Sequence, residues 1–151
     1  MSRSQKRPAS KKELEHEQTN KEEKRKVKIL VVDDEPDMRE MLSGILLHKG
    51  HEVITAQNGH EAIEIVRGDG LSIIFMDIKM PDMNGVEAYK EIKKTHTIAE
   101  MVMMTGYAVE NLVKEAMNEG AYACLKKPFE MDDMLNIVEK ITDRQDLKAF
   151  E

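Results

Sequence analysis

From Val27 onward, the chain alternates short apolar runs with segments whose apolar residues recur at helical spacing. This alternation is typical of βα units that build a parallel sheet. Two of the runs, Ile29–Val32 and Ile73–Met76, are apolar throughout, which indicates strands covered by helices on both faces. Five βα units are present, so we expect a three-layer α/β/α fold with a five-stranded parallel sheet. Right-handed crossover connections then favour the flavodoxin-like strand order 2-1-3-4-5.

Turn and capping residues give the expected bounds of the elements. Pro36 is a favoured first-turn residue, and apolar residues at helical spacing follow it until Gly50. The strands are expected over 27–32, 52–56, 71–76, 101–104 and 121–125. The helices are expected from 36, over roughly 59–67, over 86–92, over 109–117 and from 131 to about 147. Their apolar stripes place Met41, Met117 and Met131 toward the core.

Residues 1–26 differ in composition from the rest of the chain. They carry nine Lys/Arg and five Asp/Glu, and their only large apolar residues are Met1 and Leu14. Such a segment buries too little surface to offset the entropy of ordering. We therefore expect a disordered N-terminal tail followed by one domain over 27–148. A basic tail that binds an acidic partner is the alternative.

The charge of the folded part restricts its ligands. Residues 27–151 carry fourteen Lys/Arg and twenty-four Asp/Glu, a net charge of −10, which argues against direct binding of nucleic acid. No apolar stretch is long enough for a membrane span, and the N-terminus lacks the apolar segment of a secretory signal. Cys124 is the only cysteine, so no internal disulfide can form. We expect a cytoplasmic protein that does not insert into membranes.

Polar residues follow four of the expected strands. Asp33 and Asp34 follow the first strand, Asp77 the third, Thr105 the fourth and Lys127 the fifth. In an open parallel sheet the carboxyl ends of the strands share one edge, where ligands bind. We therefore expect three carboxylates, a hydroxyl and an ammonium group to meet at this edge.

Three carboxylates at one edge require a counter-charge. Two carboxylates about 4 Å apart repel by roughly 4 kcal/mol at an effective dielectric constant near 20. A hard divalent cation relieves this repulsion, and Mg²⁺ accepts a few carboxylates together with waters and phosphate oxygens. A carboxylate beside Mg²⁺ can attack phosphorus, with Mg²⁺, Lys127 and Thr105 each stabilising one phosphoryl oxygen.

Four segments, in this order, resemble the receiver domain of two-component response regulators: Val31–Glu35, Asp77–Gly85, Met104–Gly106 and Leu125–Phe129. The resemblance covers roughly residues 27–148. It implies a phosphorelay signalling domain that receives its phosphoryl group from a sensor histidine kinase or a histidine phosphotransfer protein. It implies no enzymatic activity beyond self-phosphorylation and slow autodephosphorylation.

The resemblance implies that Asp77 accepts the phosphoryl group. It also implies a Mg²⁺ site in which Asp34, Asp77 and the backbone carbonyl of Lys79 are direct ligands. In that site Asp33 acts through a coordinated water.

The same resemblance implies roles for the hydroxyl and the ammonium group. Thr105 moves toward the phosphoryl group, and Lys127 forms an ion pair with it. The Lys127–Pro128 peptide bond is expected to be cis, a form that costs little before proline.

Cys124 departs from the family pattern. The family usually has Tyr or Phe at this position, and that side chain swings inward on activation. Tyr122, two residues earlier, is expected on the same side of the strand but at another depth. Tyr107, two residues after Thr105, is bulky, and we expect it to shield an acyl phosphate from water and slow its hydrolysis.

These observations predict a receiver whose phosphorylation shifts the equilibrium between two states of a protein-binding surface. The expected surface comprises the helix near 109–117, the strand near 121–125 and the helix from 131. Its downstream partner is an unidentified protein, and a homodimer is compatible with the sequence.

Two other functions fit parts of the pattern. A metal-dependent phosphohydrolase with an aspartyl-phosphate intermediate is the main alternative, although the segment after the first strand lacks the hydroxyl residue of such enzymes. A flavin carrier fits less well, because acids stand where a phosphate-binding loop would follow the first strand.

Overall fold

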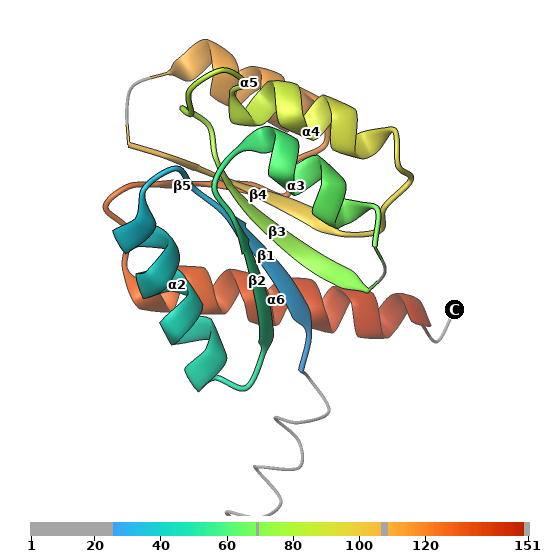
Figure 1. Cartoon of the computed structure of the whole chain (residues 1–151). Coiled ribbons are helices and arrows are strands. Elements are labelled where there is room, and N and C mark those ends of the chain that lie inside the picture. The colour runs from blue at the N-terminus through green and yellow to red at the C-terminus, as the bar shows by residue number, and fades with distance from the viewer. Residues whose placement is uncertain (1–25, 69, 107–108, 150–151) are drawn as a thin grey trace, which may run out of the picture.

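A computed structural model describes residues 26–68, 70–106 and 109–149. Five parallel strands form one sheet in the order β2-β1-β3-β4-β5, which confirms the expected flavodoxin-like topology. The strands are β1 (Lys28–Val32), β2 (Glu52–Ala56), β3 (Leu71–Asp77), β4 (Glu100–Thr105) and β5 (Ala123–Lys126). The helices are α2 (Pro36–His48), α3 (Gly59–Val66), α4 (Gly85–Lys93), α5 (Glu110–Asn118) and α6 (Met131–Ala149). Figure 1 shows α2 and α6 on one face of the sheet and α3, α4 and α5 on the other.

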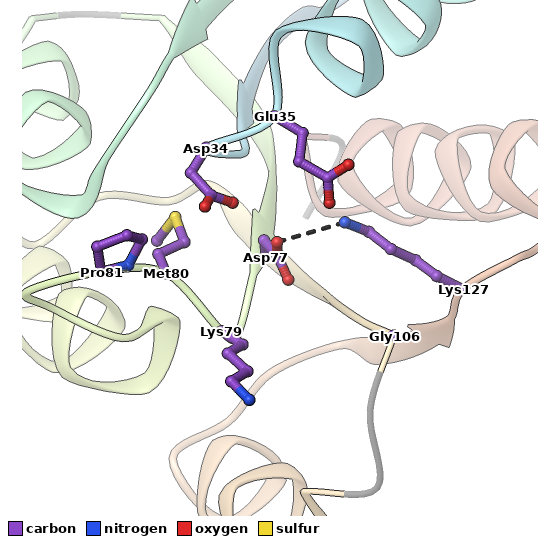
Figure 2. A pocket seen from close by; sticks show the side chains of 8 residues that line it. All are labelled: Asp34, Glu35, Asp77, Lys79, Met80, Pro81, Gly106 and Lys127. Carbon is purple, nitrogen blue, oxygen red and sulfur yellow. Dashed lines mark hydrogen bonds and ion pairs between the residues drawn. The ribbon is translucent and has the colours of Figure 1, made fainter.

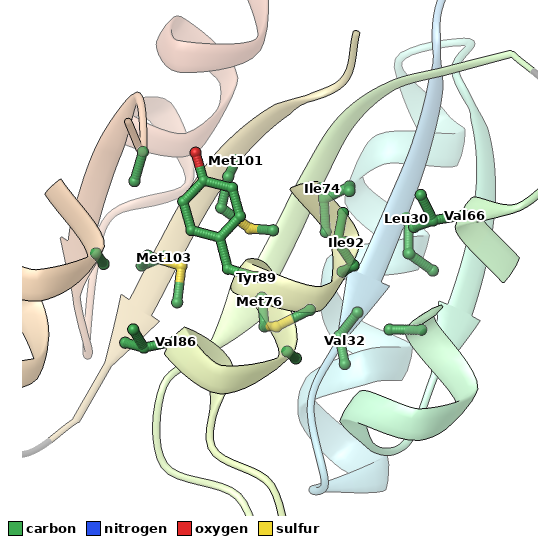
Figure 3. Close-up of a cluster of buried hydrophobic side chains, with 14 of the residues drawn as sticks. Leu30, Val32, Val66, Ile74, Met76, Val86, Tyr89, Ile92, Met101 and Met103 are labelled. Atoms are coloured by element: carbon green, nitrogen blue, oxygen red, sulfur yellow. The ribbon is translucent and has the colours of Figure 1, made fainter. Parts of the chain in front are cut away.

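The strands are buried on both faces because successive side chains enter two different hydrophobic cores. Leu30 and Ile74 belong to the α3/α4/α5 core, which contains residues of these three helices (Figure 3). Ile29 and Phe75 belong to the α2/α6 core on the opposite face. The nearly all-apolar composition of β1 and β3 is therefore explained by burial on both sides.

The strand register brings the polar strand ends together. Val32 pairs with Met76, Asp77 with Met104, and Thr105 with Lys126. Because all strands run in parallel, the residues that follow these pairs lie along one edge of the sheet.

The expected start of β5 is wrong, and the position expected for Tyr122 is wrong with it. Regular pairing of β5 begins at Ala123, although the Tyr122 N–H donates to the carbonyl of Met101 at 2.8 Å. The alternation of faces along β5 therefore does not extend back to Tyr122. Tyr122 packs against the α2/α6 core, with the Arg144 guanidinium 5.9 Å from its ring centre, whereas Cys124 packs against the α3/α4/α5 core.

Side-chain caps begin two helices. The Asn58 side chain accepts a hydrogen bond from the Glu61 N–H at the start of α3. At the start of α4, the Asn84 side chain accepts from the N–H groups of Val86 and Glu87, and the Glu87 carboxylate accepts from the Asn84 N–H. This capping box fixes the loop between Asp77 and α4.

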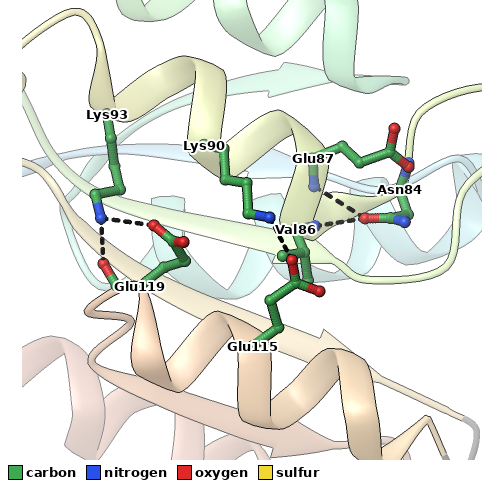
Figure 4. A network of polar contacts seen from close by, with 7 residues as sticks. All are labelled: Asn84, Val86, Glu87, Lys90, Lys93, Glu115 and Glu119. Carbon is green, nitrogen blue, oxygen red and sulfur yellow. Dashed lines mark hydrogen bonds and ion pairs between the residues drawn. The ribbon is translucent and has the colours of Figure 1, made fainter.

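α5 is bound to α4 by polar contacts (Figure 4). The Lys93 ammonium donates to the Glu119 carboxylate at 2.8 Å and to its carbonyl at 2.6 Å. Lys90 forms an ion pair with Glu115. Ala116 is the one residue of α5 that is fully buried. These polar contacts join the C-terminal half of α5 to its neighbour helix, in addition to the packing of Ala116 on the core.

Three methionines predicted to face the core are exposed instead. Met41, Met117 and Met131 are 51%, 42% and 51% exposed. The buried residues are Leu42 and Leu46 in α2 and Ala116 in α5, because these helices use a narrower apolar face than their stripes indicate. No helix among the described residues is long and apolar enough to cross a membrane.

We expect Gly85→Ala to destabilise the domain strongly. A Cβ at this position would collide with the Asp77 backbone carbonyl and would lie 3.0 Å from the Ile78 Cα. Both are backbone atoms, so the collision can be relieved only by a shift of α4. The free energy of unfolding should therefore fall by roughly 1–3 kcal/mol. Urea denaturation followed by circular dichroism measures this change.

The matched control is Gly44→Ala in α2. A Cβ there meets nothing within 4 Å, so this change should stabilise the domain by roughly 0.5–1 kcal/mol through helix propensity alone. If Gly85→Ala and Gly44→Ala changed the free energy of unfolding equally, α4 would not be packed closely against the end of β3.

Candidate functional site

A cavity of about 390 Å³ opens at the carboxyl edge of the sheet (Figure 2). The loops after β1, β3, β4 and β5 contribute to its wall. Its lining residues are Asp34, Glu35, Asp77, Lys79, Met80, Pro81, Gly106 and Lys127. The predicted convergence of strand ends is therefore seen for Asp34, Asp77 and Lys127.

Lys127 lies between two buried carboxylates. Its Nζ is 2.7 Å from Asp33 Oδ2 and 3.3 Å from Asp77 Oδ2. Asp33 is fully buried and Asp77 is 5% exposed. Removal of one partner from such a group leaves an uncompensated buried charge, so these three residues are energetically coupled.

Burial raises the pKa of Asp77 to about 6. The Lys127 ammonium lowers this pKa and the nearby Asp33 carboxylate raises it, so the repulsion from Asp33 adds to the effect of burial. Burial alone would lower the pKa of Lys127, but the two carboxylates raise it above its ordinary value. The Lys127 ammonium therefore stays protonated. At Asp77, protons compete with any cation that the carboxylate binds.

The donor set is suited to a hard cation. Carboxylate oxygens of Asp33, Asp34 and Glu35 lie within 4.8 Å of one another. Oxygen-only ligands of this kind are those that Mg²⁺ takes in proteins, together with waters. Asp77 lines the same cavity as Asp34, so the three predicted carboxylates, Asp33, Asp34 and Asp77, fit a magnesium site, and Glu35 adds a fourth carboxylate to it.

Two residues that contact Asp33 were not given a site role from the sequence. Glu35 lines the cavity, and its N–H donates to Asp33 Oδ1 at 3.0 Å. Arg39, one helical turn further on, donates to the Asp33 backbone carbonyl at 2.7 Å. The sequence offers one indication for Glu35, its position directly after the two acids Asp33 and Asp34. It offers none for Arg39, because that contact depends on the direction in which α2 leaves the turn.

Thr105 and Asp33 are predicted site residues that do not line the acidic cavity: Asp33 contacts it through Lys127, and the Thr105 carbonyl accepts from the Lys127 N–H at 2.7 Å. Thr105 is buried at the end of β4 and lines a neighbouring cavity between α5 and β5. Gly106 follows it and does line the acidic cavity. Tyr107 lies outside the described residues, so its predicted shielding role stays a prediction.

The cis peptide bond predicted between Lys127 and Pro128 is confirmed. Lys79 lines the cavity, and its backbone hydrogen bond to Asp77 acts to lower the pKa of that carboxyl. Cys124 is half-buried, and burial raises the pKa of its thiol, so the thiol is protonated near neutral pH.

Comparison with known proteins identifies one family. Residues 29–139 match the family model described as the response regulator receiver domain. The chain is 37% identical over 114 residues to the chemotaxis protein CheY of Bacillus subtilis, a match that covers 75% of this chain and 95% of CheY. It is 36% identical over 121 residues to the regulatory protein AtoC of Escherichia coli, covering 80% of this chain but only 26% of AtoC. The chain thus spans about a quarter of AtoC.

Solved structures agree with these sequence matches. A response regulator receiver domain protein from Clostridium thermocellum superimposes with a TM-score of 0.76 at 30% identity. The superposition covers 80% of this chain and 98% of that protein. The comparisons give no support to the phosphohydrolase alternative.

We expect Asp77→Asn to stabilise the domain at pH 7.5 in the absence of divalent cations. A carboxyl whose pKa is raised in the folded state loses stability as pH rises from its unfolded value of 3.8 through about 6. The wild type should therefore be less stable above pH 6 than below it. Asparagine removes the ionisation, and the gain should be about 1–2 kcal/mol, since one unit of pKa corresponds to about 1.4 kcal/mol.

Urea denaturation at pH 5 and pH 7.5 with a chelator measures this gain. The stabilisation by Asp77→Asn should be smaller at pH 5, where Asp77 of the wild type is largely protonated. A variant that is equally stabilised at both pH values would show that ionisation of Asp77 is not the cause.

Proposed function

The chain belongs to the response regulator receiver domain family and is a phosphoryl-accepting signalling domain, and we propose that Asp77 is the residue that accepts the phosphoryl group. The observation that carries the proposal is the position of Asp77. Its carboxylate lines the cavity at the sheet edge, beside Lys127 and opposite Asp34. Asp33, by contrast, is fully buried and does not line the cavity.

The proposed transfer is a single substitution at phosphorus. A carboxylate oxygen of Asp77 forms a new O–P bond as the P–N bond of a donor phosphohistidine breaks. The imidazole leaves with the electron pair and takes a proton from solvent. The product is an acyl phosphate on Asp77, and no oxidant or reductant is needed.

Mg²⁺ is the ion that we assign to this site, because receiver domains bind it at an acidic pocket. Asp34, Asp77 and the Lys79 carbonyl would hold it, Asp33 would act through a water, and Glu35 would add negative charge nearby. When bound, Mg²⁺ neutralises charge on the carboxylates and on the phosphoryl oxygens.

Lys127 holds a proton and a positive charge where the phosphoryl group arrives. In the absence of that group its ammonium contacts Asp33 and Asp77. We infer that it shifts toward a phosphoryl oxygen once Asp77 is modified, because modification changes the charge it faces. Thr105 would then leave the neighbouring cavity to donate its hydroxyl proton to another phosphoryl oxygen.

This function requires two protein partners, a phosphoryl donor and a downstream target. A sensor histidine kinase or a histidine phosphotransfer protein supplies the phosphoryl group in the cytoplasm. A downstream protein binds the surface formed by α5, β5 and α6, whose state depends on Thr105 and Asp77. Some relatives are larger regulators, and the present chain corresponds to their receiver part.

Acetyl phosphate with Mg²⁺ should add one base-labile phosphoryl group to the wild type, measured by intact mass. Asp77→Asn should gain none, since the amide is not a nucleophile toward phosphorus. Asp146→Asn, an exposed change on α6, should be modified like the wild type. Modification of Asp77→Asn at the wild-type level would refute the assignment, and turnover of a generic phosphomonoester would favour the phosphohydrolase.

Mg²⁺ should raise the thermal midpoint of the wild type at pH 7.5, because a ligand that binds only the folded state stabilises it. Asp34→Asn should lose most of this increase, and Asp146→Asn should keep it. The increase should also fall at pH 5, since protons compete at Asp77, whose pKa is about 6. Differential scanning fluorimetry measures all three, and an unchanged response of Asp34→Asn would place the ion elsewhere.

A further inference from the structure

The backbone and the side chain of Asp33 are both held by hydrogen bonds. Its N–H donates to the Ala56 carbonyl of β2 at 3.2 Å. Its carboxylate accepts from the Glu35 N–H at 3.0 Å and from the Lys127 ammonium at 2.7 Å. Its backbone carbonyl accepts from the Arg39 guanidinium at 2.7 Å. The position of Asp33 is therefore fixed from β2, from the turn after β1, from α2 and from the segment after β5.

The carbonyl that Arg39 holds belongs to the peptide bond between Asp33 and Asp34. A peptide group is planar, so a hydrogen bond to its oxygen also restrains the N and Cα atoms of Asp34. The Asp34 side chain is exposed and lines the acidic cavity, where its carboxylate extends toward Asp77 (Figure 2). Arg39 therefore acts on the peptide plane from which the Asp34 carboxylate extends.

Helix stability does not account for an arginine at this position. α2 begins at Pro36, and the helix dipole disfavours a cation near a helix N-terminus. Arg39 forms no ion pair with any residue that the structure describes. The turn also lacks a side-chain cap, since the Glu35 side chain accepts no capping hydrogen bond. The polar contact of the Arg39 side chain is instead with the turn that carries Asp33 and Asp34.

Arg39 is itself fixed relative to this turn. Its backbone N–H donates to the Glu35 carbonyl at 3.1 Å, which is the first backbone hydrogen bond of α2. Its side chain is partly buried and lines a cavity between α2 and β2, together with Pro36 and Val53. A side chain that is already restrained by packing loses little further freedom when it forms a hydrogen bond. The guanidinium is therefore well placed to restrain the carbonyl that it contacts.

We propose that Arg39 is a positioning residue of the magnesium site. By holding the peptide between Asp33 and Asp34, it keeps the Asp34 carboxylate in the orientation in which this group binds the ion. Arg39 does not touch the ion. This inference rests on the proposed function, in which Asp34 is a ligand of Mg²⁺. Loss of a group that orients a metal ligand weakens metal binding about 10–100-fold.

Charge and geometry predict opposite effects of removing the guanidinium. A positive charge near the site repels Mg²⁺, so its loss alone would strengthen binding of the ion. Loss of the hydrogen bond frees the peptide and should weaken binding. The sign of the change in Mg²⁺ affinity therefore distinguishes positioning from a through-space effect of charge.

Isothermal titration calorimetry with Mg²⁺ at pH 7.5 measures this affinity on the full chain. We expect Arg39→Met to bind Mg²⁺ about tenfold more weakly than the wild type. Arg39→Lys retains a donor and the charge, so it should recover most of the affinity. Arg67→Met removes an exposed arginine that pairs with Glu64, and it should bind like the wild type. Should Arg39→Met not fold, Arg39→Ala is tested in its place.

Two further measurements separate positioning from a loss of stability. The ¹⁵N resonance of the Asp34 amide responds to a hydrogen bond on the Asp33 carbonyl. Without divalent cations, it should shift in Arg39→Met and stay unchanged in Arg67→Met. With acetyl phosphate, the Mg²⁺ concentration that gives half the maximal rate should rise about tenfold in Arg39→Met, while the maximal rate stays within about twofold of the wild type.

Four results would overturn the inference. These are Mg²⁺ binding by Arg39→Met that is as tight as that of the wild type or tighter, an Arg39→Lys variant as weak as Arg39→Met, an unshifted Asp34 resonance, and a lower maximal rate without a change in the half-saturating Mg²⁺ concentration. Weak binding by Asp34→Asn together with full binding by Arg39→Met refutes only this inference. Full binding by Asp34→Asn, or no phosphoryl uptake by the wild type, refutes the proposed function.

Discussion

The ammonium group of Lys127 is the interaction on which the site depends. Asp33 and Asp77 are both buried at the carboxyl edge of the sheet, and the repulsion between two buried carboxylates calls for a nearby positive charge. Lys127 supplies it from the last strand, so the first, third and fifth strands must all be in place before the carboxylates can coexist. The three residues therefore couple the ends of three strands at this edge of the sheet.

Much of this arrangement follows from the sequence because parallel strands have one carboxyl edge. The alternation of apolar runs and helical stripes predicted the strand order, and the polar residues after four runs predicted which side chains meet. Asp34, Asp77 and Lys127 lie in one cavity as expected. These predictions needed only the direction of each strand and its last residue.

What the sequence did not predict depends on side-chain direction and local geometry. Thr105 ends β4 as expected, and its backbone carbonyl accepts a hydrogen bond from the Lys127 N–H, but the residue lines the cavity between α5 and β5 and not that of Asp77. Tyr122 packs on the face opposite to the one expected because β5 begins at Ala123, two residues later than predicted. The contact of Arg39 with the Asp33 carbonyl depends on the angle at which α2 leaves the turn, and no pattern of residue types encodes that angle.

The two hydrophobic cores described above have a consequence for how the domain tolerates change. The sheet separates them completely, because β1 and β3 contribute alternate residues to each layer. A methyl group lost from Ile29 cannot be compensated by a larger residue at Leu30, since the two side chains occupy different layers. Substitutions in different layers should combine nearly additively, whereas those within one layer should show strong epistasis.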